Sequence, residues 1–302
     1  MRRMTAATAM ALCLVAGVAG AQTTGQGRGQ RPPMTPEQQA AAAARREAEQ
    51  NAPRPIEGID SVWMEELTWM EVRDAIKEGR STALILTGGV ESNGPHLATG
   101  KHNFILKVMG EAIARKLGNA LVAPIVTLEP GRPEGRVPPG SVFLSQDTYR
   151  AVLTDMATSL KSMGFTTVIM IGDSGGNQGG MKAVTEALAT KFGDTPTRFL
   201  FIPEYYDYSS VQKLIKDSGI PEEIEIGASQ GSDRLHEEFG IDALMALYDP
   251  TTIRLAQREK AGRATINGVP LLPLDKTLEM ARKIVELRTK LTVDAIAKAL
   301  AK

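Results

Sequence analysis

The stretch "GFTTVIMIGDSGGN", residues 164–177, decides the fold of this chain. Its β-branched and apolar residues form a short run without polar interruption, which is typical of a strand buried on both faces of a parallel sheet. Gly172 ends the run, and polar residues and glycines lead into the helical sequence "GGMKAVTEALATKFG", residues 179–193. A buried strand, a glycine-rich turn and a helix in this order predict one unit of an α/β fold.

The chain on either side of this unit continues the alternation. We expect further strands in residues 81–89, 119–128 and 198–206, and helices in residues 103–118, 145–164 and most of the C-terminal third. Ser145 is the expected N-cap of one helix, and Gly118 and Gly164 are expected helix ends. We therefore predict a single α/β domain over residues 57–302, with a mainly parallel sheet and helices on both faces.

The N-terminus has the order of a secretory signal peptide. Arg2 and Arg3 precede an apolar run that ends in the small residues 19–21, and this run is shorter than the ~20 strongly apolar residues that span a bilayer. We expect residues 1–21 to be removed, which places the mature protein in the periplasm or outside the cell with no contact to a membrane. Cys13, the chain's single cysteine, leaves with this segment, so the mature chain has no thiol for a disulfide or a nucleophile.

Residues 22–56 are rich in Gln, Ala, Pro, Gly and Arg. Such a composition cannot bury a core, so it predicts a flexible low-complexity linker with at most a transient helix. Over the whole chain, 35 basic and 35 acidic residues give a formal net charge of zero. This balance does not suit binding to nucleic acid or to an anionic membrane, and it favours a small molecule as the substrate.

Polar residues follow the expected strands at the ends where ligands bind in parallel sheets. "TGGVESNGPHLATGKHN", residues 87–103, contains Glu91, His96 and His102, and the third histidine, His236, lies in another polar segment. Imidazole and carboxylate together suit Zn or Mn, so Glu91, His102 and His236 are candidate ligands of one divalent metal. Asp173 is a further candidate ligand. The spacing of the histidines matches no common metal motif, so a site without metal is the open alternative.

The turn after residue 171 allows two other interpretations. Residues 172–176 match the G-x-S-x-G nucleophile elbow, with Ser174 as nucleophile, His236 or His102 as base, and Asn93 or backbone N–H groups as oxyanion donors. Alternatively, the glycines and Asn177 only permit a tight turn whose backbone faces a ligand. The Pro- and Gly-rich loop of residues 129–145 lies earlier in the chain, between an expected strand and the helix after it. We expect it to form a wall of the site, with Arg132 and Arg136 available to a substrate carboxylate.

Several segments, in their order and spacing, resemble the creatininase (creatinine amidohydrolase) family. They are "EELTWMEVRDAI", "ESNGPHL", "PPGSVFLSQDTY", "GFTTVIMIGDSGGN" and "HEEFGIDALMALYDP", which together cover most of residues 60–260. The resemblance implies an α/β domain with a parallel sheet, assembly into a homo-oligomer, and hydrolysis of a cyclic amide or similar C–N bond by water on a two-metal site.

The family pattern can be carried over to individual positions. The resemblance places Glu91 at the first metal-binding glutamate, His96 at the histidine of G-P-H-L, His236 at the histidine of H-A-G, and Glu134 at a glutamate of the long loop. It also marks the chain as a divergent member. Asn93 replaces a metal-binding histidine, His102 a bridging aspartate, Ser174 and Gly135 further histidines, and Ile241 a late glutamate.

One imidazole cannot replace a carboxylate that bridges two cations, so we do not expect the two-metal centre here. Three hypotheses follow: a hydrolase with a rebuilt single-metal site, a metal-free hydrolase that uses Ser174, and a non-catalytic protein that binds a small molecule in the same fold. The predicted catalytic residues are Ser174, His236, Asn93 and Asp173, and the predicted substrate-binding residues are His96, Asn177, Glu134 and Arg136.

Overall fold

The computed structural model describes residues 34–222 and 237–301, so the expected signal peptide and His236 lie outside the described residues. The chain divides into two units, residues 1–52 and residues 53–302. The first contains helix α1, Pro36–Asn51. Thr35 is its N-cap and forms a reciprocal capping box with Gln38. No residue of α1 is buried, so local hydrogen bonds and helix propensity stabilise it. It lies in the range for which the sequence predicts a low-complexity linker.

The second unit is built on a sheet of four parallel strands in the order β2-β1-β3-β4. The strands are β1 Thr82–Thr87, β2 Ala120–Val122, β3 Thr167–Gly172 and β4 Arg198–Phe201. All residues of β1 and β3 are buried, and the two strands pair along their whole length. The parallel sheet expected from the uninterrupted apolar sequence of β3 is confirmed.

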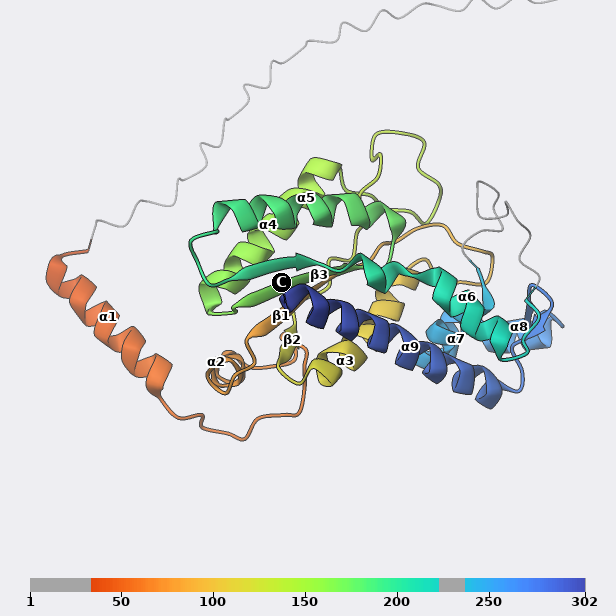
Figure 1. The fold of residues 1–302 in the computed structure, drawn as a ribbon, viewed down its shortest axis with the longest axis horizontal. Coiled ribbons are helices and arrows are strands. Elements are labelled where there is room, and N and C mark those ends of the chain that lie inside the picture. Colours follow the sequence, from red (N-terminus) through yellow and green to blue (C-terminus); the bar gives the residue numbers. More distant parts are fainter. Residues whose placement is uncertain (1–33, 223–236, 302) are drawn as a thin grey trace, which may run out of the picture. The chain divides into compact units, whose positions relative to one another are not determined.

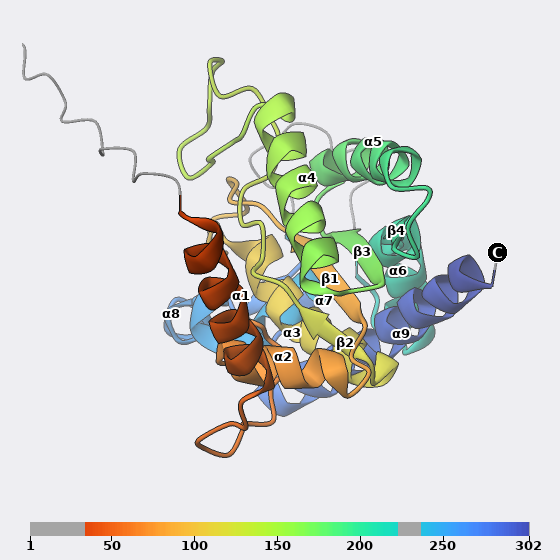
Figure 2. The same cartoon turned by 90° about the vertical axis from the view of Figure 1, so that its left-hand side faces the viewer.

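Helices cover both faces of the sheet, as predicted. Figures 1 and 2 show α4, Gln146–Met163, and α5, Gly175–Lys191, on one face, and α3, Lys101–Leu117, and α9, Leu274–Leu300, on the other. Alternate residues of β1 and β3 point to opposite faces of the sheet. Leu84, Leu86, Ile169 and Ile171 belong to the core with α3 and α9, and Ala83, Ile85, Val168 and Met170 to the core with α4 and α5.

The remaining elements complete the layers around this frame. They are α2 Trp69–Lys77, η1 Pro203–Tyr206, α6 Tyr208–Asp217, α7 Phe239–Tyr248, η2 Pro250–Ile253, α8 Leu255–Lys260, and the hairpin of β5 Thr265–Ile266 and β6 Val269–Pro270. None of the helices within residues 34–222 and 237–301 has the length and apolar character needed to cross a bilayer.

The strand expected over residues 119–128 is shorter than predicted, since β2 ends at Val122. Three other differences in boundaries concern the site. α3 begins at Lys101 instead of residue 103, so that Lys101 and His102 belong to its first turn. α5 begins at Gly175, because Ser174 serves as its N-cap and the glycines form its first turn. The predicted strand 198–206 ends at Phe201, since Pro203 has no N–H to continue the ladder, and the tyrosines that follow form the short helix η1.

Candidate active site at the carboxyl ends of β1 and β3

A cavity of about 400 Å³ lies beyond the ends of β1 and β3. Its polar lining includes Glu91, His102, Glu129, Arg132, Ser174 and Tyr206. A second cavity of about 590 Å³ adjoins it and shares His102 and Tyr206 as lining residues. Both therefore occur where the parallel strands end, which is the expected ligand-binding edge of such a sheet.

His102 bridges two carboxylates from different elements. Its Nδ1 lies 2.8 Å from Oδ2 of Asp173, which follows β3, and its Nε2 lies 2.9 Å from Oε1 of Glu91, which follows β1. Burial by itself lowers the pKa of this histidine, but the hydrogen bonds with Asp173 and Glu91 raise it above its ordinary value. The arrangement favours an imidazolium that donates to a carboxylate on each side.

Glu91 also contacts the preceding residue of α3. The ammonium of Lys101 lies 3.0 Å from the same Oε1 atom, and only 1% of the lysine side chain is exposed. Burial raises the pKa of Glu91, but the hydrogen bond with His102 and the charge of Lys101 outweigh it and hold this pKa well below its usual range. Glu91 is therefore ionised throughout the pH range in which the protein is expected to act.

Asp173 is fully buried, and besides His102 it accepts hydrogen bonds from Arg288, Tyr205 and, at 3.4 Å, Tyr208. Nη2 of Arg288, from α9, and the hydroxyl of Tyr205 donate to its Oδ1 at 2.9 and 2.8 Å. Burial raises the pKa of Asp173, but the charge of Arg288 and the hydrogen bond with His102 lower it below its ordinary value. The guanidinium of Arg288 also stacks over the rings of Tyr205 and Tyr208, at 4.1 and 5.0 Å from their centroids.

Glu129 is the second carboxyl group that faces the cavity, and its environment differs from that of Glu91. The hydroxyl of Ser174 donates to its Oε2, and its Oε1 is a buried oxygen without a hydrogen-bond partner among the described residues. Burial and the neighbouring charge of Glu91 raise the pKa of Glu129, although the bond from Ser174 lowers it. Two neighbouring carboxyls with opposite pKa shifts can act as proton donor and fixed anion in one reaction.

Comparison with known proteins agrees with this architecture. The sequence model described as "Creatininase: Creatinine amidohydrolase" matches residues 65–267. The chain belongs to the creatininase family. A search among curated proteins finds no match.

Solved creatininases share the fold at low sequence identity. A mutant creatininase with a tryptophan replaced by alanine superposes with a TM-score of 0.56 at 19% identity, covering 80% of this chain and 99% of the other. A glutamate-to-glutamine mutant creatininase described as Zn-Zn type gives 0.54 at 20% identity over 80% and 98%. A structure described as "Creatininase Mn" gives 0.52 at 19% identity over 80% and 98%.

Four of the predicted site residues meet in the cavity region of this family member. Glu91, His102, Asp173 and Ser174 lie together, since β1 and β3 are neighbours and α3 begins beside them. Ser174 hydrogen-bonds to Glu129 and to neither of the two histidines that the structure describes, His96 and His102. Its backbone has an ordinary extended conformation with φ −106° and ψ 146°. The turn thus lacks the strain that is typical of a nucleophile elbow.

The other predicted residues take different positions. Nδ2 of Asn93 donates to the backbone oxygen of Glu91 at 3.0 Å, which orders its own loop. Nδ2 of the buried Asn177 donates to the carbonyls of Thr87 and Gly88 at 2.7 and 2.9 Å, which ties α5 to the end of β1. Both amides therefore support the backbone of the site.

The remaining substrate-binding candidates lie away from the lining of the cavity. His96 approaches Glu237, with Nδ1 3.5 Å from Oε1, at a geometry that does not make a hydrogen bond. Glu134 and Arg136 are exposed on the long loop, and of the two predicted arginines only Arg132 lines the cavity. His236, predicted as ligand and as base, lies outside the described residues.

Sequence reasoning did not single out Lys101, Glu129, Tyr205 or Arg288. Glu129 comes directly after a strand-like segment, which is the same signal that marks Glu91 and Asp173, so it could have been found. Lys101 and Arg288 lie on helices whose sequences contain many other charged residues, and such residues are usually solvated. Only the tertiary structure distinguishes these two from the exposed cations around them.

A metal ion fits this arrangement poorly. No group of three or more His, Asp or Glu side chains in the described ranges is placed to hold one. Both ring nitrogens of His102 lie within 3 Å of carboxylate oxygens, and Oε1 of Glu91 already contacts the ammonium of Lys101. Of the predicted single-metal set, Glu91 and His102 lie together but hold these donors in contacts with other groups. The third member, His236, lies outside the described residues, so the set stays a prediction.

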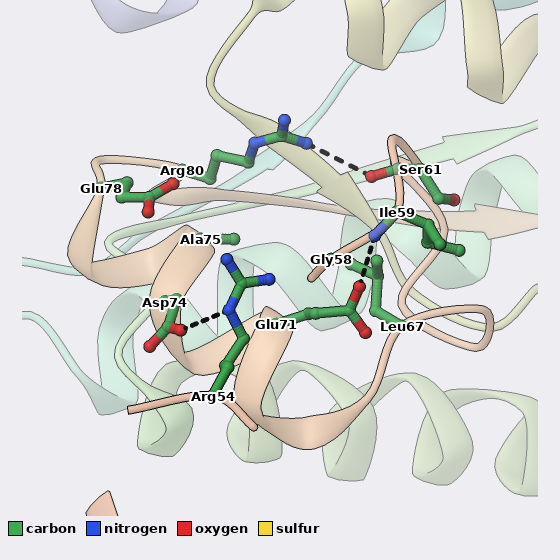
Figure 3. Close-up of a pocket in the computed structure, with 10 residues that line it drawn as sticks. All are labelled: Arg54, Gly58, Ile59, Ser61, Leu67, Glu71, Asp74, Ala75, Glu78 and Arg80. Atoms are coloured by element: carbon green, nitrogen blue, oxygen red, sulfur yellow. Dashed lines mark hydrogen bonds and ion pairs between the residues drawn. The ribbon is translucent and has the colours of Figure 1, made fainter. Parts of the chain in front are cut away.

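A further hollow, of about 190 Å³, lies beside the amino end of β1 (Figure 3). Four of its charged residues, Arg54, Glu71, Asp74 and Arg80, already interact with other groups around it. Nε of Arg54 lies 3.0 Å from Oδ2 of Asp74, and Oε1 of Glu71 accepts the N–H of Ile59 at 2.7 Å. It lies at the opposite end of the strand from the candidate site, so we assign the site to the carboxyl edge.

Proposed function

We propose that this protein is an exported hydrolase of the creatininase family that cleaves a small cyclic amide, or a related C–N or ester bond, in the cavity at the ends of β1 and β3. The observation that carries the proposal is the pair of neighbouring carboxyl groups of Glu91 and Glu129, whose pKa values are shifted in opposite directions. Family membership supports the reaction class.

The residues suggest how the proton is moved. Hydrolysis of an amide needs a group that takes a proton from the attacking oxygen and returns it to the leaving nitrogen. Glu129 is suited to this role, because its raised pKa lies nearer to neutrality and its Oε2 already accepts the hydroxyl of Ser174. The attacking oxygen forms the new C–O bond as Glu129 receives its proton, and the C–N bond breaks as Glu129 protonates nitrogen.

Two oxygens are candidates for the attack. Ser174 would form an acyl intermediate that water then hydrolyses, whereas a water molecule beside Glu129 would give the product in one stage. Glu91 remains ionised in either case, held by Lys101 and His102. The cavity of about 400 Å³ suits a small ring. The signal-like order of residues 1–21 supports the proposal that such a substrate is met outside the cytoplasm. Assembly into a homo-oligomer is proposed from the family resemblance.

Glu129→Gln provides the direct test. The mature protein is incubated with a panel of small lactams, cyclic ureides, lactones and amino-acid amides, and ring opening is followed by NMR. For a compound that the wild type opens, we expect kcat to fall by about 100-fold or more in Glu129→Gln. Glu186→Gln, on the exposed side of α5, is the matched control and keeps full activity. A wild type that opens none of these compounds overturns the proposal.

Ser174→Ala separates the two candidate nucleophiles. If Ser174 attacks, a fluorophosphonate probe labels the wild type, and both labelling and turnover disappear in Ser174→Ala. If water attacks, the wild type is not labelled and Ser174→Ala keeps measurable turnover, because Glu129 still accepts the proton.

A further inference from the structure

Two cations of the chain itself lie in the interior beside the site. The side chains of Lys101 and Arg288 are 1% and 2% exposed. They come from α3 and α9, which both lie on the same face of the sheet (Figure 1). A buried ammonium or guanidinium is costly unless it is paired and hydrogen-bonded, so the position of each must be explained by its partner.

The partners are the two carboxylates that follow β1 and β3. Nζ of Lys101 lies 3.0 Å from Glu91, and Nη2 of Arg288 lies 2.9 Å from Asp173. His102 joins the pairs, because its two ring nitrogens contact one carboxylate each. The result is a continuous row of alternating charge, from Lys101 through Glu91, His102 and Asp173 to Arg288.

This row occupies the donors that a metal ion would need. A metal bound to His102 requires a free ring nitrogen, but each nitrogen is engaged at 2.8 or 2.9 Å. A divalent ion on Oε1 of Glu91 would lie against the ammonium of Lys101, and the repulsion between the two cations would oppose binding. Asp173 is fully buried and already accepts hydrogen bonds from Arg288 and Tyr205.

We propose that Lys101 and Arg288 supply the positive charge that solved creatininases described as Zn-Zn type or Mn obtain from metal ions, so that this protein works without a metal. The catalytic part of the inference rests on the proposed function. The charge replacement itself does not, because metal content and thermal stability report on it without any substrate.

The first experiment measures metal on the wild-type protein. The full chain is expressed and exported, purified without a metal column, and analysed by elemental mass spectrometry. We expect less than about 0.1 Zn, Mn or Fe per chain, and a Tm that neither EDTA nor a tenfold excess of Zn²⁺ or Mn²⁺ changes. About one metal per chain, lost in Glu91→Gln, overturns the inference. A metal-free protein that opens no ring compound contradicts the proposed function and leaves the charge replacement standing.

The second experiment removes one of the cations. Lys101→Met keeps the bulk of the side chain but leaves Glu91 without its ammonium, and we expect Tm to fall by roughly 10 °C. The double variant Lys101→Met with Glu91→Gln should recover at least half of that loss, because the uncompensated charge is then absent. Lys290→Met, which breaks an exposed ion pair with Asp294 on α9, is the control and should change Tm by less than about 2 °C.

The outcomes of the second experiment are also decisive. A Lys101→Met variant as stable as the wild type shows that the ammonium does not neutralise Glu91, and so overturns the inference. If Lys101→Met does not fold but the double variant does, the pairing is supported, since removing both charges together restores what removing one destroys. If neither folds, the metal measurement on the wild type decides.

Discussion

Arg288 and Asp173, which are 115 residues apart in the sequence, form an ion pair in which Nη2 lies 2.9 Å from Oδ1. Both side chains are almost completely excluded from solvent. The pair joins α9 to the end of β3, and therefore connects the last helix of the chain to the candidate active site. The hydroxyl of Tyr205, from η1, donates to the same oxygen of Asp173.

Replacing Arg288 with Met is expected to destabilise the protein strongly. The variant leaves the carboxylate of Asp173 buried with a weaker set of partners, and breaking one side of a buried pair costs about 3–5 kcal/mol. Urea unfolding at pH 7 measures the loss. Lys283→Met, which breaks an exposed pair with Glu279 on the same helix, should cost less than about 1 kcal/mol. Equal losses in the two variants would show that burial of the pair contributes nothing.

The two residues of this pair illustrate how far the sequence alone reaches. Asp173 directly follows the most strand-like run of the chain, so the rule that ligands bind at the carboxyl ends of parallel strands marks it. Glu91 is found in the same way after β1. β1 and β3 pair in parallel from Thr82 and Thr167 onward, so their carboxyl ends lie at the same edge of the sheet. The two carboxylates that follow them therefore come close together.

Arg288 could not be found in this way. The helical sequence that contains it carries many exposed Lys, Arg and Glu residues, and periodicity only predicts that a helix is present. Whether this arginine faces solvent or Asp173 depends on how α9 lies across the sheet, which is a property of the tertiary structure. Lys101 is similar, since the predicted helix starts after it and the observed α3 includes it.

Adjacent glycines of α5 should respond in opposite ways to alanine. A Cβ on Gly180 would lie 2.6 Å from Cε1 of the buried Tyr149, so that α5 and α4 would have to move apart, at a cost of about 1–3 kcal/mol. A Cβ on Gly179 would meet nothing within 4 Å, and alanine there should add about 0.5–1 kcal/mol of helix stability. Chemical denaturation of both variants tests this. The prediction is wrong if Gly180→Ala is as stable as Gly179→Ala.

Asp242 gives the folded state a pH dependence that can be assigned to one residue. Burial, with the neighbouring charge of Glu237, raises its pKa to about 8, although Nη1 of Arg258 lies 2.8 Å from its Oδ2. Since the pKa is higher in the folded state than in the unfolded state, the contribution of Asp242 to stability is complete below about pH 4. It is lost as the pH rises through about 8.

We therefore expect the free energy of unfolding of the wild type to fall from pH 5 to pH 9 more steeply than that of Asp242→Asn. One pKa unit corresponds to about 1.4 kcal/mol, so the difference between the two slopes should be measurable by urea unfolding at a series of pH values. Asp294→Asn, on the exposed side of α9, serves as the control and should run parallel to the wild type. Parallel curves for Asp242→Asn would assign the fall in stability to other groups.

The substitution Asn177→Asp should destabilise the protein far more than the similar size of the two side chains suggests. The amide of Asn177 donates to the carbonyls of Thr87, the last residue of β1, and of Gly88, which follows it. These residues lead into the segment that carries Glu91. In Asn177→Asp, an ionised carboxylate would face these two carbonyl oxygens in a fully buried position, and we expect a loss of at least about 3 kcal/mol at pH 7. Asn177→Ala, which removes the donors without adding a charge, should cost less at that pH.

The order of the two Asn177 variants is expected to depend on pH. A protonated aspartic acid can donate one hydrogen bond to a carbonyl, and burial beside two acceptors would raise the pKa of the new carboxyl group. Its contribution to stability is then present below the unfolded pKa of about 3.9 and is lost as the pH rises. The gap between Asn177→Asp and Asn177→Ala should therefore shrink from pH 7 to pH 4. A gap that does not change would mean that the side chain has turned away from Thr87 and Gly88, and that this amide does not hold the end of β1 against α5.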